Sequence, residues 1–361
     1  MFLKDHLYAD ARAFRLSILF CGLVLFLAGC AKERGSPRET GEILWGTSSV
    51  GSSGHRALLA LATLLNRESD QFDITVRPMP GAVMTIRNYS SGNLDGFYGA
   101  DVSFQELAEN AGRFAGFRER MQREPLQSFW VYSMSMGVAI HERDRDRIKD
   151  WSDLDGKVVF TGPGPWDTRA HLERLFRELE INHVYQEVDL GLAGSQLHSG
   201  GVDAVGVYIT GTRDLAPWVA EMELSTDIAL LNPNAAQIER LAQAGYQRFS
   251  ASPEIFQTKV HVDEGHFFPF FYGFHLGEDI SEKELYEILV LLEENALELA
   301  GADPVFRQIA DDMPGLQRDG VARTIDYARV HPGLARYMRE RGVWDESWDD
   351  RIALLPSNTA E

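Results

Sequence analysis

The sequence predicts an α/β fold in two lobes, each a mostly parallel sheet flanked by helices, with a ligand cleft between the lobes. Two observations predict it. One order of strands, loops and helices occurs twice along the chain, and the element Ser-Gly-x-aliphatic-Asp closes both copies. In addition, about 330 residues follow the N-terminal segment, which is more than one small core needs and suits two lobes.

The first copy lies between residues 42 and 98. Apolar residues from Leu58 to Leu65 recur at helical spacing, and residues 72–76 alternate as a strand does. In order, the copy comprises a strand at 42–45, a loop at 46–54, the helix, the strand at 72–76, a short helix around Val83 and Ile86, the element Ser91-Gly92-Asn93-Leu94-Asp95 and a strand at 96–98.

The second copy repeats this plan between residues 157 and 208. It comprises a strand at 157–160, a loop at 161–167, a helix at 168–180 with Asp167 or Thr168 as its N-cap, a strand at 184–190, the element Ser199-Gly200-Gly201-Val202-Asp203 and a strand at 204–208. In open α/β sheets the ligand lies beyond the carboxyl ends of the strands. Both loops, 46–54 and 161–167, are therefore expected to face one cleft, although their Gly and Pro residues alone could simply shape turns.

The lobe boundaries follow from two apolar stretches. Residues 129–140 are expected to carry the chain into the second lobe, and residues 267–276 to return it. An amphipathic helix at 285–299 should end at Gly301, and the rest should pack as helices on the first lobe. The sequence thus predicts lobe I from 41–135 plus 265–361 and lobe II from 136–264.

The N-terminal segment has the features of a lipoprotein signal peptide, residues 1–29. A weakly basic start precedes a short apolar stretch at 16–27, which ends in Leu27-Ala28-Gly29-Cys30. We expect Cys30 to be lipidated, residues 30–40 to form a tether, and the protein to lie in the periplasm, held to a membrane by this lipid. The alternative is an uncleaved signal anchor in which Cys30 has no role.

Composition excludes several functions. The net charge of −19 argues against nucleic-acid binding, which needs a basic face. The chain has two cysteines, Cys21 and Cys30, so the mature domain is expected to have no disulfide, no cysteine metal site and no cysteine nucleophile. His261, His266 and His275 match no common metal motif and are expected to be solvated loop or hinge residues. We therefore expect no metal and no cofactor.

Five motifs in order resemble the TAXI family of solute receptors of TRAP transporters, over most of 41–345. They comprise Gly46-Thr47, Gly51 and Leu64-Leu65-Asn66; Pro80-Gly81-Ala82-Val83 to Arg87 with Ser91-Gly92-x-Leu94-Asp95; Asp153-Leu154-x-Gly156-Lys157; the 161–168 loop; and His331-Pro332-Gly333 with Tyr337 and Glu340. The resemblance implies a two-lobed fold like that of type II periplasmic binding proteins, a small-molecule solute, and the membrane subunits of a TRAP transporter as partners.

The departures from the family pattern lie where a ligand would bind. The family's Gly-Thr-Tyr-Tyr-Pro is replaced by Ser52-Ser53-Gly54-His55-Arg56, and its Gly-Ser-Gly-Thr by Pro165-Trp166-Asp167-Thr168. The family's dicarboxylate-type ligands are therefore not transferred to this chain.

Candidate ligand-binding residues come from both loops and from the strands that follow them. Arg56 and Arg169 follow their loops at the start of a helix, so they could clamp an anion such as a carboxylate, or pair with surface acids. Asp101 could accept a ligand amine or cap its helix. The hydroxyl, backbone and aromatic candidates are Ser48, Ser49, Gly51, Ser52, Ser53, Tyr98, Pro165, Trp166, Asp167, Thr168 and Tyr208. The aromatic residues could equally serve in core or rim packing.

Motifs for catalysis are missing. The sequence has no Gly-x-Ser-x-Gly elbow, no His-Glu-x-x-His and no dinucleotide fingerprint. We therefore expect a binding protein and not an enzyme, with a lipid-anchored ligand sensor for a signalling receptor as the alternative.

Overall fold

The computed structural model describes residues 42–50, 52–211 and 213–356. The predicted signal peptide at 1–29, the lipidation of Cys30, the tether at 30–40 and the role of Gly51 concern residues outside these ranges. Within the described part of the chain, no helix combines the length and apolar character needed to cross a membrane.

The first copy of the repeat forms the elements that its periodicity predicts. Three parallel strands lie in the order β2-β1-β3. The helix α1 buries the apolar face predicted from its spacing. The bounds are β1 Glu42–Thr47, α1 Ser53–Glu68, β2 Asp73–Pro78, α2 Ala82–Ser90, β3 Gly96–Ala100 and α3 Asp101–Ala108.

The second copy has the same topology. Its strands lie in the order β6-β5-β7, again all parallel. The bounds are β5 Val158–Phe160, α4 Asp167–Glu178, β6 Val184–Tyr185, α5 Ala193–Ser199 and β7 Ala204–Thr210. Each copy of the predicted internal repeat therefore forms the centre of one lobe, and the two lobes are similar.

The repeated Ser-Gly-x-aliphatic-Asp element serves the same purpose in both lobes. Gly92 and Gly200 have φ angles of 80° and 79°, a left-handed conformation that favours glycine at the end of a helix. The carboxylate of Asp95 accepts a hydrogen bond from the backbone N–H of Leu44 at 2.8 Å, and that of Asp203 from Val158 at 3.0 Å. Each aspartate thus ties the start of the third strand to the first strand.

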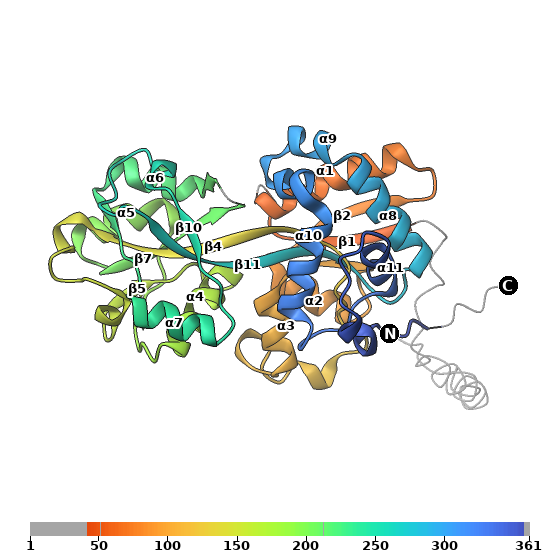
Figure 1. The fold of residues 1–361 in the computed structure, drawn as a ribbon, viewed down its shortest axis with the longest axis horizontal. Helices are drawn as coiled ribbons and strands as arrows, with labels where there is room; N and C mark the ends of the chain where they lie inside the picture. The colour runs from red at the N-terminus through yellow and green to blue at the C-terminus, as the bar shows by residue number, and fades with distance from the viewer. Residues whose placement is uncertain (1–41, 51, 212, 357–361) are drawn as a thin grey trace, which may run out of the picture. The chain divides into compact units, whose positions relative to one another are not determined.

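Two long antiparallel strands, β4 (Trp130–His141) and β11 (Gly265–Leu276), connect the lobes, and Figure 1 shows them crossing from one to the other. β11 pairs with β3 of the first lobe, whereas β4 pairs with β7 of the second. The orders β2-β1-β3-β11 and β6-β5-β7-β4 confirm the predicted two-lobed α/β fold. The exact lobe boundaries stay a prediction, because both strands run through both sheets.

The remaining elements complete the two lobes. In the second lobe β8 pairs with β7, and β9 pairs with β4. β10 pairs with the amino-terminal end of β11. The C-terminal helix α10 packs on β4, and α11 packs on α8. Their bounds are β8 Asp214–Leu215, α6 Pro217–Ser225, β9 Ile228–Leu230, α7 Ala235–Gln243, β10 Phe249–Ala251, α8 Glu282–Glu294, α9 Ala296–Ala302, α10 Arg307–Thr324 and α11 Pro332–Glu340.

Three sequence predictions differ from the structure. The predicted helix at 285–299 breaks at Asn295, where φ of −108° and ψ of 15° end α8 and the side-chain amide donates to the carbonyl of Leu291. The predicted strand at 184–190 is only two residues long, because Asp189 instead caps a short 3-10 helix. The N-cap of α4 is Trp166, because the Asp167 side chain is engaged elsewhere.

Candidate functional site

A pocket opens between the amino ends of α1 and α4, beside β3, β4, β7 and β11. It contains about 590 Å³ of space, a volume that includes solvent at its open mouth. The lining residues are Ser48, Ser49, Ser52, Ser53, Gly54, Pro80, Gly81, Ala82, Tyr98, Met134, Pro165, Trp166, Asp167, Thr168, Tyr208 and Tyr272. Residues of both predicted loops are thus brought to one pocket.

The loop between β1 and α1 forms the wall from the first lobe. The hydroxyls of Ser48 and Ser52 are hydrogen-bonded at 2.6 Å, and Ser52 also caps α1 by accepting from the backbone N–H of His55 at 3.2 Å. Gly54 permits close packing here, since a Cβ would lie 2.6 Å from Ser48 Oγ and 2.9 Å from Tyr98 Cζ. Part of this hydroxyl cluster therefore serves the helix as well as the pocket.

The start of α4 forms the opposite wall. Trp166 is half-buried and holds the N-cap position without a side-chain hydrogen bond. Asp167 and Thr168 are almost fully buried, with exposed fractions of 1% and 2%. The Thr168 hydroxyl has no hydrogen-bond partner among the described residues. This wall presents polar atoms that the protein leaves partly unpaired.

Tyrosines form the floor of the pocket. The rings of Tyr98 and Tyr272 stack at 4.9 Å with nearly parallel planes, and the Tyr98 hydroxyl is hydrogen-bonded to that of Tyr132. Burial raises the pKa of Tyr208 to about 12 and raises the pKa of Tyr98 and Tyr272 well above the usual value. These phenols therefore stay neutral at physiological pH and can act as donors.

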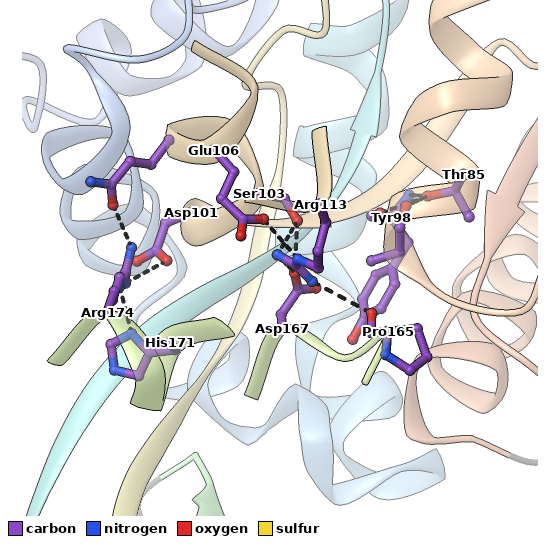
Figure 2. A network of polar contacts seen from close by, with 12 residues as sticks. Thr85, Tyr98, Asp101, Ser103, Glu106, Arg113, Pro165, Asp167, His171 and Arg174 are labelled. Carbon is purple, nitrogen blue, oxygen red and sulfur yellow. Dashed lines mark hydrogen bonds and ion pairs between the residues drawn. The ribbon is translucent and has the colours of Figure 1, made fainter. Parts of the chain in front are cut away.

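Asp167 is held by two residues of the first lobe (Figure 2). Its Oδ1 accepts from the Ser103 hydroxyl at 2.6 Å and lies 2.7 Å from the Arg113 guanidinium. Arg113 also pairs with Glu106 at 2.7 Å. The other oxygen of Asp167, Oδ2, is buried without a hydrogen-bond partner in the described part of the chain.

A second polar network joins the lobes beside the pocket, and we call Asp101, His171, Arg174 and Arg323 the Asp101 network. Arg174 lies 2.9 Å from Asp101 Oδ1 and donates to His171 Nδ1 at 2.8 Å. His171 contacts the carbonyl of Phe268 at 3.1 Å, and Arg323 lies 3.6 Å from Asp101 Oδ2. Asp101 therefore lies outside the pocket lining, where Arg174 and Arg323 hold its carboxylate. It does not cap its helix either, since Ala100 is the N-cap of α3.

Arg56 and Arg169 also lie outside the pocket lining. Arg56 is more than half exposed and lies 3.5 Å from Asp303. Arg169 pairs with Glu173 at 2.8 Å, and its guanidinium lies 3.5 Å from the ring centre of Tyr185. The structure therefore does not bring these arginines together across the pocket.

Several residues near the pocket were not singled out from the sequence. Tyr272 and Met134 belong to the crossing strands, and the aromatic run at 267–274 is the signal that could have drawn attention to β11. Arg113 and Ser103 belong to no sequence motif that we recognised. They contact Asp167, which is distant in the sequence, only because the two lobes meet.

The described residues contain no group of three or more His, Cys, Asp or Glu that could hold a metal ion. The histidine prediction was wrong in one respect. His275 is not solvated but fully buried between aromatic rings, and burial lowers its pKa to about 3. Its Nδ1 accepts from the backbone N–H of Ser128, so it serves the packing of the crossing strand.

No protein-family model and no curated protein match this chain. Similar solved structures include the periplasmic aliphatic sulphonate binding protein SsuA from Escherichia coli, at 14% identity over 87% of this chain and 98% of that one, with a TM-score of 0.42. MatC from Rhodopseudomonas palustris with bound malate is 14% identical over 81% and 99%, with a TM-score of 0.45. The probable amino-acid ABC transporter extracellular-binding protein YtmK from Bacillus subtilis is 12% identical over 76% and 99%, with a TM-score of 0.42.

The fold assignment rests on the strand order of this chain, which defines a two-lobed α/β fold of the type II periplasmic-binding-protein kind.

Proposed function

We propose that this protein is an extracytoplasmic solute-binding protein that holds a small organic molecule between its two lobes. The observation that carries this proposal is the pocket where the two equivalent loops meet, at the carboxyl ends of β1 and β5. Two crossing strands connect the lobes on one side of this pocket, an arrangement in which the lobes can close around a solute. Binding without turnover is the expected activity, so the solute should be recovered unchanged.

We further propose lobe boundaries at 135/136 and 264/265, a lipid on Cys30, and delivery of the solute to the membrane subunits of a TRAP-type transporter. The short apolar stretch that ends in Leu27-Ala28-Gly29-Cys30 supports the anchor, and the five motifs that resemble the TAXI family support the partner. Labelling cells with a radioactive fatty acid should mark the parent and not Cys30→Ser. Solute uptake in vesicles that carry the membrane subunits should require this protein, and a receptor kinase that responds instead would favour the sensor alternative.

The test of binding is thermal unfolding with a broad library of small solutes, followed by isothermal titration of any that stabilise the protein. Ser53→Trp should abolish the stabilisation, because Ser53 lines the pocket and lies after the cap of α1. Ser347→Trp introduces the same side chain at an exposed position outside the lining and should bind as the parent does. Normal binding by Ser53→Trp would show that the solute lies elsewhere.

A further inference from the structure

Two neighbouring residues of the pocket wall each have a polar atom without a partner in the described part of the chain. These atoms are Oδ2 of Asp167 and Oγ1 of Thr168, both on the first turn of α4 and both buried. Asp167 Oδ1, in contrast, has two donors. Since a buried unpaired carboxylate oxygen is costly, a donor that reaches this oxygen would stabilise the wall.

The charge around this oxygen is negative. Among the described residues of the lining, Asp167 is the one ionisable carboxylate, and none is Lys, Arg or His. Arg113, the cation next to it, is shared with Glu106, so two carboxylates face one guanidinium. Asp167 also occupies the first turn of α4, where it already compensates the positive end of the helix dipole. An anionic group would therefore meet repulsion at this wall, and a cationic group attraction.

The tyrosines of the pocket suit the same kind of group. Tyr98, Tyr208 and Tyr272 belong to the lining. Aromatic faces attract cations, and the attraction is larger where water is excluded. The rings also offer apolar surface for a carbon skeleton.

We infer that the solute carries a protonated amine whose N–H donates to Oδ2 of Asp167 while its carbon skeleton lies against the tyrosine rings. The Thr168 hydroxyl, adjacent to Asp167 on α4, is available as a second partner for a polar group of the solute. This inference rests on the proposed function and names the solute class for the same pocket.

The test uses matched probes that differ in one group. The sets are butylamine, butanol and butyrate; cyclohexylamine, cyclohexanol and cyclohexanecarboxylate; and benzylamine, benzyl alcohol and benzoate. Thermal unfolding of the parent protein should show stabilisation by amines and not by their alcohol or carboxylate counterparts. Benzyltrimethylammonium, which keeps the charge but has no N–H, should bind at least about 10-fold more weakly than benzylamine.

Asp167→Asn should weaken binding of the best amine by at least about 30-fold, because a desolvated charge pair loses one partner. Asp146→Asn removes a carboxylate that is 90% exposed and should bind as the parent does. The probe series on the parent decides the question even if Asp167→Asn fails to fold. Stabilisation by carboxylates or alcohols alone overturns this inference and leaves the proposed function intact. A parent protein that no probe and no member of the broad solute library stabilises overturns both.

Discussion

The Asp101 network and the pocket lie next to each other between the lobes, and they differ in how completely their polar atoms are paired. In the Asp101 network, Arg174 contacts Asp101, His171 and the Gln105 side chain, and His171 contacts a backbone carbonyl. In the pocket, Asp167 Oδ2 and Thr168 Oγ1 lack partners within the described ranges of the chain. In the described part of the chain, the side chains of the Asp101 network are thus paired with other protein groups, whereas two polar atoms of the pocket residues are left for a solute to pair with.

This difference assigns the two regions different tasks. The Asp101 network links α3 to α4 with charges that are almost fully buried, so it holds the lobes together without a solute. The pocket wall also joins the lobes through Asp167 Oδ1. Asp167 Oδ2 and Thr168 Oγ1, which have no partner among the described residues, would gain contacts only from a solute, so the pocket should govern affinity. Substitutions in the network should therefore change the stability of the protein more than substitutions around the pocket do.

Breaking the Asp101 network should have the largest effect. Arg174→Met leaves the carboxylate of Asp101, which is 1% exposed, without its closest cation. The loss of one partner of a buried pair costs about 3–5 kcal/mol. Denaturant unfolding should show this loss, whereas Arg177→Met, at an exposed position on the same helix, should stay within about 0.5 kcal/mol of the parent. Equal stabilities of the two variants would contradict the assigned role.

Low pH should lower the stability of the fold through buried histidines outside the pocket lining. Burial and the neighbouring Arg174 and Arg323 lower the pKa of His171 well below its usual value, and burial lowers the pKa of His331 to about 4. Because these imidazoles bind protons more readily when the chain is unfolded, their contribution is complete above about pH 6.5 and is lost as the pH falls towards 4. For His331 alone, the loss is roughly 2–3 kcal/mol between pH 7.5 and 4.5.

The measurement is urea unfolding at a series of pH values across this window. A free energy of unfolding that stays constant from pH 7.5 to 4.5 would show that these histidines are not buried in the neutral form.

The close packing of α1 against Tyr98 gives a smaller expected effect. In Gly54→Ala the new methyl group would lie within 3 Å of Ser48 and Tyr98, which should cost about 1–3 kcal/mol. Gly301→Ala, also in a helix but with no described atom outside its own helix backbone and chain neighbours within 4 Å of the new Cβ, should instead stabilise the protein by about 0.5–1 kcal/mol. Thermal unfolding of both variants tests this, and equal shifts would show that the pocket wall adapts freely.

The smallest effects are expected for the two arginines that the sequence placed in an anion clamp. Arg56→Ala and Arg169→Ala should each change stability by no more than about 1 kcal/mol, because both ion pairs are partly exposed. Solute affinity should stay within about threefold of the parent, since neither side chain lines the pocket. A loss of 30-fold or more in titration with the bound solute would restore the clamp hypothesis and contradict the amine assignment.

The fold was largely predictable because its signals are local. Helical spacing in α1 and α4, alternation in β2 and the repeated Ser-Gly-x-aliphatic-Asp element depend on residues close in sequence. The helix break at Asn295 and the short β6 were missed, because side-chain hydrogen bonds override apolar periodicity there. Residues of both loops were correctly expected at one cleft, since topology determines the edge of the sheet at which they lie.

The sequence by itself determined two similar lobes, the order of their elements and the loops that meet between them, because strand order and helical periodicity are encoded in each copy. Only the tertiary structure decided the direction of the charged side chains. Arg113 and Asp167 lie in different lobes and pair because the lobes meet, whereas Arg169 pairs with Glu173 one helical turn away. Ion pairing depends on distance and burial in three dimensions, so the charge of the pocket could not be inferred from the placement of arginines in the sequence.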